Sequence, residues 1–417
     1  MMKFATCRGL GISLAFAILS GAASAQTLTT LYSFSGGNDG AAPDSGLIAD
    51  ALGNLYGTTP FGGTSNGGTV FKLTPPTTRG GPWTETVLWS FTGNDGLQPH
   101  AGLIADPGNL YGTTEFGGTS GLGTVFKLTP PTTSGGPWTQ TVLWSFTGGS
   151  DGDTPKAGLI ADASGNLYGT TQKGGLGVGS GTEGGGTVFK LTPPTTSGGP
   201  WTHTVLWAPV FSLGDLVNPV AGLIADASGA LYGTATTDLG GTGGVFNLTP
   251  PTTSGGPWTV TAIWRFNGSD GATPIAALIA DASGNLYGTT VFGGTSNGGT
   301  VFKLTPPTTS GGPWTQTVLW SFTGGSDGAQ PSAGLIADAS GNLYGTTFGT
   351  GTIPSFGTVF KLTLPATFVG KPGQANCNGQ SITYFANTYG GMAGAAAALG
   401  YASVRDFQNA VASFCRS

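Results

Sequence analysis

The segment "ADASGNLYGTT" at residues 161–171 has close copies at five other places in the chain, and this repetition indicates the architecture. One tyrosine marks each copy: Tyr56, Tyr111, Tyr168, Tyr232, Tyr287 and Tyr344. These tyrosines are 55 to 64 residues apart, and the insertions fall in glycine-rich stretches such as 173–186. A long period of this kind indicates a tandem array of one structural unit.

Each unit contains four short runs that are typical of β-strands. The runs are AGLIAD (157–162), LYGTT (167–171), TVFKLTP (187–193) and, in the preceding copy, TVLWSF (141–146). They are rich in β-branched and aromatic residues and are bounded by Gly, Pro, Asn, Asp and Ser. Apolar residues occupy both faces of the runs, so we expect strands that are covered on both sides.

A four-stranded unit of about 55 residues is too long for one coil of a β-helix and matches one blade of a β-propeller. The segment TLTTLYSF (27–34) aligns with the fourth strand, and the last unit stops after its third strand, TVFKLTL (358–364). The count is then 24 strands, or six blades if the N-terminal strand closes the last blade. We therefore expect an all-β, six-bladed propeller over 27–365, with an open β-solenoid as the competing architecture.

The repeated motif supplies a tight hairpin between the first two strands of each blade. In "DASGN" (162–166), Gly165 permits a positive φ, Asn166 tolerates one, and the Asp162 carboxylate can accept backbone N–H groups. Twelve of the nineteen acidic residues stand either in this turn or in a recurring "DG" turn, so we interpret them as architectural. Those twelve are Asp50, Asp106, Asp162, Asp226, Asp281 and Asp338, and Asp39, Asp95, Asp151, Asp215, Asp270 and Asp327.

The motif P-x-A-G-L-I-A-D-A-S-G-N-L-Y-G-T-T…G-G-T-V-F-K-L-T-P resembles the GloVer (Gloeo-Verruco) tandem repeat of exported bacterial proteins, which are described as "choice-of-anchor" because their C-terminal attachment signals vary. The resemblance covers roughly 28–365 in all six units, and unit four departs from it with Ala230 for Asn and Asn247 for Lys. It implies export and a propeller-like domain, without a defined activity. The blade motif is more distantly similar to NHL-repeat, streptogramin-lyase-like and gluconolactonase-like propellers, which is a fold-level analogy.

The first 25 residues have the layout of a secretory signal peptide. Lys3 and Arg8 precede an apolar run over 9–19, and Ala-Ser-Ala at 23–25 suits cleavage before Gln26. An uncleaved N-terminal anchor is the alternative, although the run is short for a membrane span of roughly 20 residues. We expect a protein that is secreted, periplasmic or on the cell surface, with no later transmembrane segment.

Charge and composition exclude some classes of function. Without Lys3 and Arg8, 12 basic residues face 19 acidic ones, a net charge of −7, which makes nucleic acid an unsuitable partner. Gly (78) and Pro (27) are abundant enough to suggest disorder, but 10% aromatic residues supply the apolar surface that disordered chains lack.

The composition changes after the last repeat. We interpret 366–376 as a linker and 377–417 as a small module of short helices, in which Ser403 caps a helix with Phe407 and Val411 on its apolar face. Cys377 and Cys415 are predicted to form a disulfide that staples this module, with two free thiols as the alternative. The module either attaches the protein to a partner or caps one end of the propeller.

Two positions vary while the frame around them repeats. The position that follows the proline before each first strand carries Asp44, His100 and Lys156 in three consecutive blades. The position after "YGTT" carries Glu115 in the second unit. Because first strands lie beside the central channel of a propeller, we predict a ligand site at the channel mouth from Asp44, His100, Lys156 and Glu115. The other histidine, His203, stands on an outer strand, where we expect it to face solvent.

No catalytic or metal-binding motif is present. CxxC, HExxH, P-loop and GxSxG patterns in their required contexts are lacking, and we predict no cofactor and no metal. The favoured function is therefore an exported, non-enzymatic binding or scaffold propeller for a glycan, peptide or cell-envelope component. One alternative is a propeller hydrolase or lyase, which convergence of the four candidate side chains would favour. The other is a purely structural surface protein.

Overall fold

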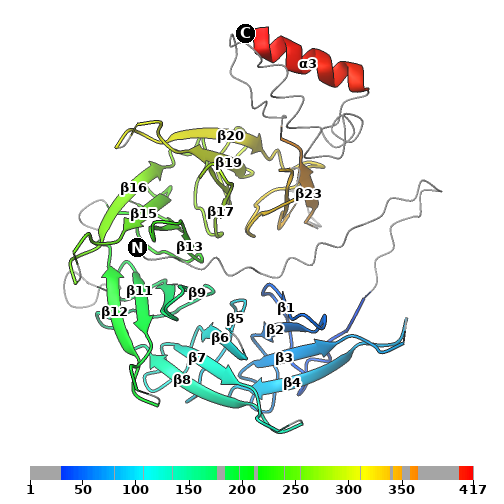
Figure 1. The fold of residues 1–417 in the computed structure, drawn as a ribbon, viewed down its shortest axis with the longest axis vertical. Coiled ribbons are helices and arrows are strands. Elements are labelled where there is room, and N and C mark those ends of the chain that lie inside the picture. Colours follow the sequence, from blue (N-terminus) through cyan, green and yellow to red (C-terminus); the bar gives the residue numbers. More distant parts are fainter. Residues whose placement is uncertain are drawn as a thin grey trace.

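The computed structural model describes residues 30–364, apart from 79, 107, 134, 176–183, 197, 211–214, 239, 254, 310, 339–340 and 350–356, and residues 403–416. The predicted signal peptide, the linker and Cys377 lie outside these residues. The described β-strands form six antiparallel sheets that are arranged as the blades of a propeller (Figure 1). The prediction of an all-β, six-bladed architecture is confirmed.

The strands follow one another within each blade in chain order. Blade 1 is β1 (Ile48–Ala49), β2 (Leu55–Thr59), β3 (Thr69–Thr74) and β4 (Thr84–Ser90). Blade 2 is β5 (Ile104–Asp106), β6 (Asn109–Thr114), β7 (Thr124–Thr129) and β8 (Thr139–Ser145). Blade 3 is β9 (Ile160–Ala161), β10 (Leu167–Thr171), β11 (Thr187–Thr192) and β12 (Thr202–Trp207).

Blades 4 to 6 repeat this order. Blade 4 is β13 (Ile224–Ala225), β14 (Leu231–Ala235), β15 (Gly244–Thr249) and β16 (Thr259–Arg265). Blade 5 is β17 (Ile279–Ala280), β18 (Leu286–Thr290), β19 (Thr300–Thr305) and β20 (Thr315–Ser321). Blade 6 is β21 (Ile336–Ala337), β22 (Leu343–Thr346) and β23 (Val359–Leu362). The first strands are shorter than the predicted six residues, and they lie innermost in Figure 1.

The hairpin aspartate organises the tight turn as the sequence suggested. In blade 3, Asp162 Oδ1 accepts the backbone N–H groups of Ser164 and Asn166 at 2.8 and 3.0 Å. Its Oδ2 accepts hydrogen bonds from Asn166 Nδ2 at 2.7 Å and from the Tyr168 hydroxyl at 3.0 Å. Gly165 has the expected positive φ of +76°, whereas Asn166 contributes through its side chain and has no left-handed backbone.

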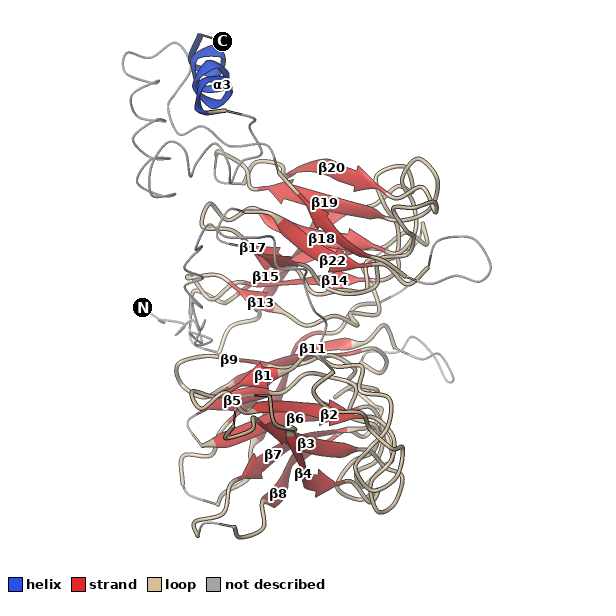
Figure 2. Cartoon of the chain, turned by 90° about the vertical axis from the view of Figure 1, so that its right-hand side faces the viewer, coloured by secondary structure: helices blue, strands red, loops and turns tan. Residues whose placement is uncertain are grey.

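Neighbouring blades are joined by a recurring hydrogen bond and by apolar packing. In each of the first five blades, a threonine of the second strand donates to the carbonyl that precedes the next blade's first strand, at 2.9–3.2 Å: Thr58–Ala101, Thr113–Ala157, Thr170–Ala221, Thr234–Ala276 and Thr289–Ala333. The apolar clusters span the same junctions, so the core is a series of wedges between successive blades. Figure 2 shows this stacking of sheets from the side.

The sixth junction is open, which corrects the prediction that the N-terminal strand closes the ring. Residues 27–29 of the predicted strand lie outside the described residues, residues 30–34 form no strand, and the described partner of β23 is β22 alone. Phe34 instead packs edge-on against Phe71 of blade 1, with the two ring centroids 4.9 Å apart. Phe91 packs against Phe126 in the same way at the next junction. Because this contact holds the segment on blade 1, and blade 1 stands apart from blade 6 in Figure 1, the segment does not reach β23.

Apolar side chains are exposed on both sides of that junction. Val359 is 82% exposed, whereas the valines at the same position of the other five blades are fully buried. Leu47 is 51% exposed on the facing blade, whereas its counterparts are buried. The sixth junction therefore lacks the burial that holds the other five together.

The C-terminal region is described for one helix, α3 (Val404–Arg416). Ser403 caps it as predicted: the Asp406 backbone N–H donates to Ser403 Oγ at 3.1 Å, and Phe407 and Val411 are buried. The other predicted helices lie outside the described residues, and the described part contains no disulfide, so the Cys377–Cys415 bond stays a prediction. No helix among the described residues is long and apolar enough to cross a membrane.

His203 is half-buried and its Nε2 atom is fully buried, which contradicts the prediction that it faces solvent. Its ring lies between Trp144 of blade 2 and Phe189, with centroids 4.7 and 5.5 Å away. Burial lowers the pKa of His203 to about 4, against the opposing charge of Asp151. The reason is that the fourth strand of one blade lies against the outer strand of its neighbour, so its inward side chains enter the junction rather than solvent.

Glu85 occupies the position of His203 on β4. Glu85 Oε1 is buried without a hydrogen-bond partner among the described residues, and burial together with the Asp39 charge raises the pKa of Glu85 to about 7. The corresponding Gln140 donates instead to the Asp95 carbonyl at 3.0 Å. Glu85 therefore places a carboxyl group at a position where blades 2 and 5 have the amide side chains of Gln140 and Gln316.

We expect Asp162→Ala to destabilise the protein by about 3 kcal/mol, because the mutation leaves buried donors without their charged acceptor. Asp106→Ala in blade 2 is the matched control, since Asp106 is exposed and accepts none of these bonds; its cost is expected to be below about 0.5 kcal/mol. Urea unfolding followed by tryptophan fluorescence measures both. Equal losses for the two variants would contradict the structural role given to the buried aspartate.

We expect the titration of Glu85 to lower the stability of the wild type relative to the Glu85→Gln variant as the pH rises from about 4.5 to 7. In this range the folded state, with a pKa of about 7, binds more protons than the unfolded state, whose pKa is near 4.5. Glu85→Gln removes this fall and makes the protein more stable than the wild type above pH 7. His203, whose pKa is lowered to about 4, contributes in the opposite direction in both proteins, so it cancels in this difference. Melting temperatures of both proteins between pH 4 and 8 check the prediction, and parallel curves would refute it.

Candidate functional site

The four candidate residues lie in loops beside the propeller axis. The loops before successive first strands approach closely: a Cβ added at Gly102 would lie 3.3 Å from the Gly46 carbonyl, and one at Gly158 would lie 3.3 Å from the Gly102 carbonyl. Glycine at this position lets the loops of neighbouring blades touch. Side chains two residues earlier in these loops are therefore brought near one another.

A strained residue fixes the loop of blade 2. Gln98 has φ +55°, its N–H donates to the Gly67 carbonyl of blade 1 at 2.8 Å, and its carbonyl accepts the Glu115 N–H at 3.0 Å. Such a backbone costs about 1 kcal/mol or more for a residue other than glycine, so it persists only where the surroundings hold it. The same conformation recurs before the proline of every blade: Ala42, Gln98, Thr154, Asn218, Thr273 and Gln330. It positions His100 and Glu115 relative to blade 1.

The four side chains form one continuous chain of ion pairs across three blades. His100 Nδ1 lies 2.7 Å from Asp44 Oδ2, and His100 Nε2 lies 3.2 Å from Glu115 Oε2. Lys156 Nζ lies 3.0 Å from Glu115 Oε1. Asp44 comes from blade 1, His100 and Glu115 from blade 2, and Lys156 from blade 3, so the chain ties these blades together at the channel mouth.

The middle of this chain is shielded and its ends are open to solvent. The Glu115 side chain is 9% exposed and the His100 side chain 26% exposed. At the ends, the Asp44 side chain is 48% exposed and the Lys156 side chain 40% exposed. The surface therefore presents a negative group and a positive group, which are separated by the half-buried His100 and the buried Glu115.

The arrangement is suited to holding charge and less suited to holding a metal. A doubly protonated imidazole donates to both carboxylates, whereas a neutral one donates to only one of them. Asp44 and Glu115 lie at opposite nitrogens of the His100 ring, so their oxygens do not converge on one point. Within the described residues, no group of three His, Cys, Asp or Glu side chains is placed to hold a metal ion.

The structure thus brings together all four residues that the sequence selected, and their role in binding a ligand stays a prediction. The order of the pairs, with His100 between two acids, was not visible in the sequence. A second group of polar residues, Asp106, Tyr111 and Lys127, lines a cavity between blades 2 and 3 and was missed. The signal that could have revealed it is the turn "DPGN", which is one residue shorter than "DASGN".

Three solved structures are similar to this chain at low identity. A luciferin-regenerating enzyme shares 15% identity with a TM-score of 0.43, over 76% of this chain and 90% of the other. The Hadza microbial sialidase Hz136 shares 12% identity with a TM-score of 0.41, over 76% and 65%. A glucose dehydrogenase shares 14% identity with a TM-score of 0.37, over 78% and 94%. None of the curated proteins matches the chain.

The repeat itself identifies the family. The family model described as the Gloeobacter/Verrucomicrobia repeat matches residues 17–182 and 176–398, and so covers all six blades. The resemblance noted in the sequence motif is thereby confirmed. This chain belongs to the Gloeobacter/Verrucomicrobia repeat family.

Proposed function

We propose that the protein is a binding propeller, and that its channel mouth binds a peptide which carries both a positive and a negative side chain. The observation that carries this proposal is the alternating chain of Asp44, His100, Glu115 and Lys156, whose two exposed ends have opposite charges. A peptide with one cationic and one anionic group complements both ends at once. A neutral glycan would leave the charges of the two ends uncompensated.

The buried carboxylate in the middle, Glu115, makes the site rigid. Glu115 is held by both His100 and Lys156, and removing one partner of a buried ion pair costs more than the pair contributes. A ligand therefore contacts the exposed ends and leaves the middle intact. Pre-organised groups of this kind lower the entropy cost of binding.

Acid–base catalysis is the second candidate function, and the convergence of the four side chains favours it. The Asp44 carboxylate on Nδ1 of His100 is the arrangement that orients an imidazole as a general base. A base also needs its other nitrogen free for the substrate, and here Glu115 occupies Nε2 at 3.2 Å. Binding is therefore the better-supported function, and a hydrolase or lyase would require the substrate to displace Glu115.

Export is also part of the proposal, on the basis of Lys3, Arg8 and the apolar run at 9–19. Expression of the full chain in a Gram-negative host, with N-terminal sequencing of the periplasmic fraction, is expected to give a mature protein that starts at Gln26. A chain that keeps its first 25 residues would support the alternative of an uncleaved anchor.

Binding can be tested with pentapeptides that carry one Lys and one Glu, separated by one to three glycines, in both orders. We expect one spacing and order to bind, and Asp44→Asn or Lys156→Met to weaken it about fivefold, the equivalent of roughly 1 kcal/mol. Raising the salt from 0.05 to 0.5 M should weaken it further, because charges that face solvent are screened. Isothermal titration calorimetry measures each affinity.

Asp153→Asn is the matched control, since it removes one charge from the same loop as Lys156 without touching the ion-pair chain. Equal binding by the wild type, Asp44→Asn and Lys156→Met would refute the proposed site. Turnover of chromogenic esters or lactones that is lost in His100→Gln would replace the binding function with the catalytic one.

A further inference from the structure

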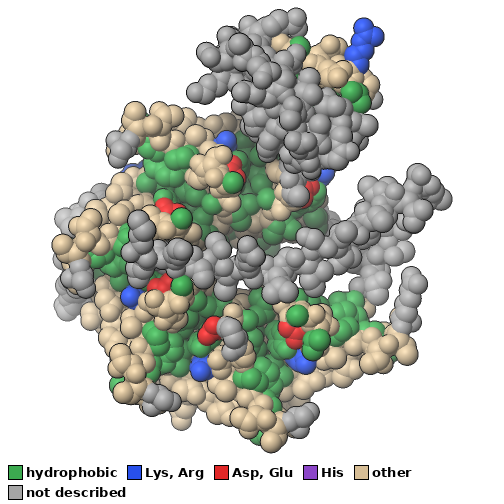
Figure 3. Space-filling model, in the orientation of Figure 1, with side chains coloured by type: hydrophobic (Ala, Val, Ile, Leu, Met, Phe, Trp, Pro, Cys, Tyr) green, Lys and Arg blue, Asp and Glu red, His purple; other side chains and the backbone are tan. Residues whose placement is uncertain are grey.

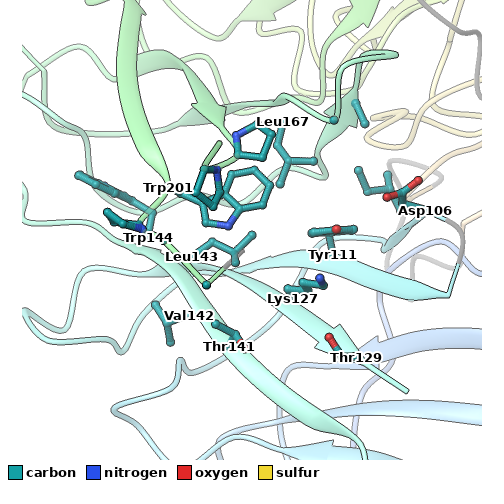
Figure 4. Close-up of a pocket in the computed structure, with 18 of the residues that line it drawn as sticks. Asp106, Tyr111, Lys127, Thr129, Thr141, Val142, Leu143, Trp144, Leu167 and Trp201 are labelled. Carbon is teal, nitrogen blue, oxygen red and sulfur yellow. The ribbon is translucent and has the colours of Figure 1, made fainter. Parts of the chain in front are cut away.

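A large cavity opens between blades 2 and 3, away from the four residues of the channel mouth. Its volume is about 1200 Å³. Blade 2 supplies Tyr111, Lys127 and Trp144 to its wall, and blade 3 supplies Leu167 and Trp201. Figure 4 shows Tyr111 and Lys127 close together, with Trp201 and Leu167 opposite them and Asp106 at one end. A cavity of this size exceeds the range of roughly 300–1000 Å³ that is usual for small-molecule sites, so it suits a ligand of several units.

One wall of the cavity belongs to blade 2, whose hairpin turn is one residue shorter than those of the other blades. In the other five blades the marker tyrosine donates its hydroxyl to the hairpin aspartate at 2.9–3.0 Å: Tyr56–Asp50, Tyr168–Asp162, Tyr232–Asp226, Tyr287–Asp281 and Tyr344–Asp338. In blade 2 the turn is one residue shorter, and Asp106 belongs to β5 and pairs with Asn109 across the hairpin. No hydrogen bond joins Asp106 and Tyr111.

Two polar groups are released by this change. The Asp106 carboxylate is exposed, and it accepts no hydrogen bond from the described residues. Tyr111 is only 7% exposed, and its hydroxyl has no hydrogen-bond partner in the described part of the chain. Fully buried side-chain atoms that lack a partner do not include this hydroxyl, because Tyr111 lines the open cavity. A hydroxyl that is free of protein partners at a cavity wall indicates a place for a hydrogen-bonding ligand.

The lining selects the chemistry of that ligand. Asp106 accepts hydrogen bonds, Lys127 donates them, and the hydroxyls of Tyr111, Thr129 and Thr141 do both. The second carboxylate of the lining, Asp162, is occupied by the donors of its own hairpin, so Asp106 and Lys127 are the charged groups left for a ligand. Their opposite charges disfavour a ligand of either net charge. Sugar hydroxyls donate and accept, so they satisfy every one of these groups.

The apolar part of the cavity supports the same ligand. The indole rings of Trp144 and Trp201 and the rings of Pro193, Pro194 and Pro200 line it. Flat aromatic surfaces bury the C–H faces of sugar rings, and Trp combines a large apolar area with a polar edge. In Figure 3, hydrophobic side chains lie between the blades, with single acidic and basic side chains beside them. The lining of the cavity has the same combination of apolar, acidic and basic groups.

A proline-rich peptide is the competing occupant, because such peptides dock in aromatic grooves. Its backbone offers carbonyl acceptors but, at proline, no N–H donor. It would satisfy Lys127 and Tyr111 and leave the Asp106 carboxylate without a donor. The polar groups of the cavity therefore favour a saccharide.

We propose that the groove between blades 2 and 3 binds a neutral oligosaccharide, which stacks on Trp201 and hydrogen-bonds to Asp106, Tyr111 and Lys127. This site shares no lining residue with the channel mouth, so the proposal does not depend on the peptide-binding function. The shortened turn of blade 2 creates it by withdrawing the aspartate from its tyrosine.

The test uses four neutral hexasaccharides, derived from cellulose, laminarin, amylose and chitin, and isothermal titration calorimetry with the full-length mature chain. We expect at least one to bind, and Trp201→Ala to weaken it at least tenfold. Tyr111→Phe removes only the released hydroxyl and is expected to weaken it about fivefold. Tyr287→Phe makes the same change where the hydroxyl is committed to Asp281, and it is expected to leave the affinity unchanged.

A second variant keeps the test valid if Trp201→Ala fails to fold. Replacing Pro107 by Ala-Ser gives blade 2 the turn of blade 3, and it is expected to restore the aspartate–tyrosine bond and abolish binding in a protein at least as stable as the wild type. The proposal is overturned if none of the four saccharides binds, or if binding survives this turn exchange. It is also overturned if decaproline binds in their place and Trp201→Ala or the turn exchange removes that binding.

Discussion

Five of the six blades are organised around one aspartate that is held inside a tight hairpin by backbone N–H groups and by a tyrosine hydroxyl. In blade 3, the carboxylate of Asp162 accepts four such bonds within the space of seven residues. A carboxylate that is buried in this way is stable only with its donors in place, so it fixes both the turn and the register of the first two strands. The marker tyrosine then lies against the next blade, where its ring contributes to the apolar wedge between them.

The same constraint explains how a repeated protein acquires individual sites. The repeat tolerates variation at positions that its hairpin and its blade packing do not use. Two such positions, the residue after the proline and the residue after "YGTT", supply Asp44, His100, Glu115 and Lys156 at the channel mouth. The cavity between blades 2 and 3 arises differently, because there the frame itself is altered. A deletion of one residue converts an architectural pair into two groups that face a cavity.

Packing between blades also decides where ionisable groups become buried. Glu85 and His203 occupy one position of the outer strand, and burial moves the pKa of Glu85 up and that of His203 down. Gln140 serves the same position with a hydrogen bond to the neighbouring turn. At the sixth junction this packing is missing, and Val359 and Leu47 remain exposed.

The number of blades, the four strands of the repeat and the turn chemistry could all be predicted from the amino-acid sequence, because they depend on local residue patterns that recur six times. The sequence also selected the four channel-mouth residues, since their variation stood out against a constant frame. Three outcomes came from the packing of the blades: which of these residues pair, that the His203 ring lies between Trp144 and Phe189, and that residues 30–34 lie on blade 1 rather than β23. Those outcomes depend on contacts between blades, and the residue pattern of one blade does not specify which side chains of the next blade it contacts.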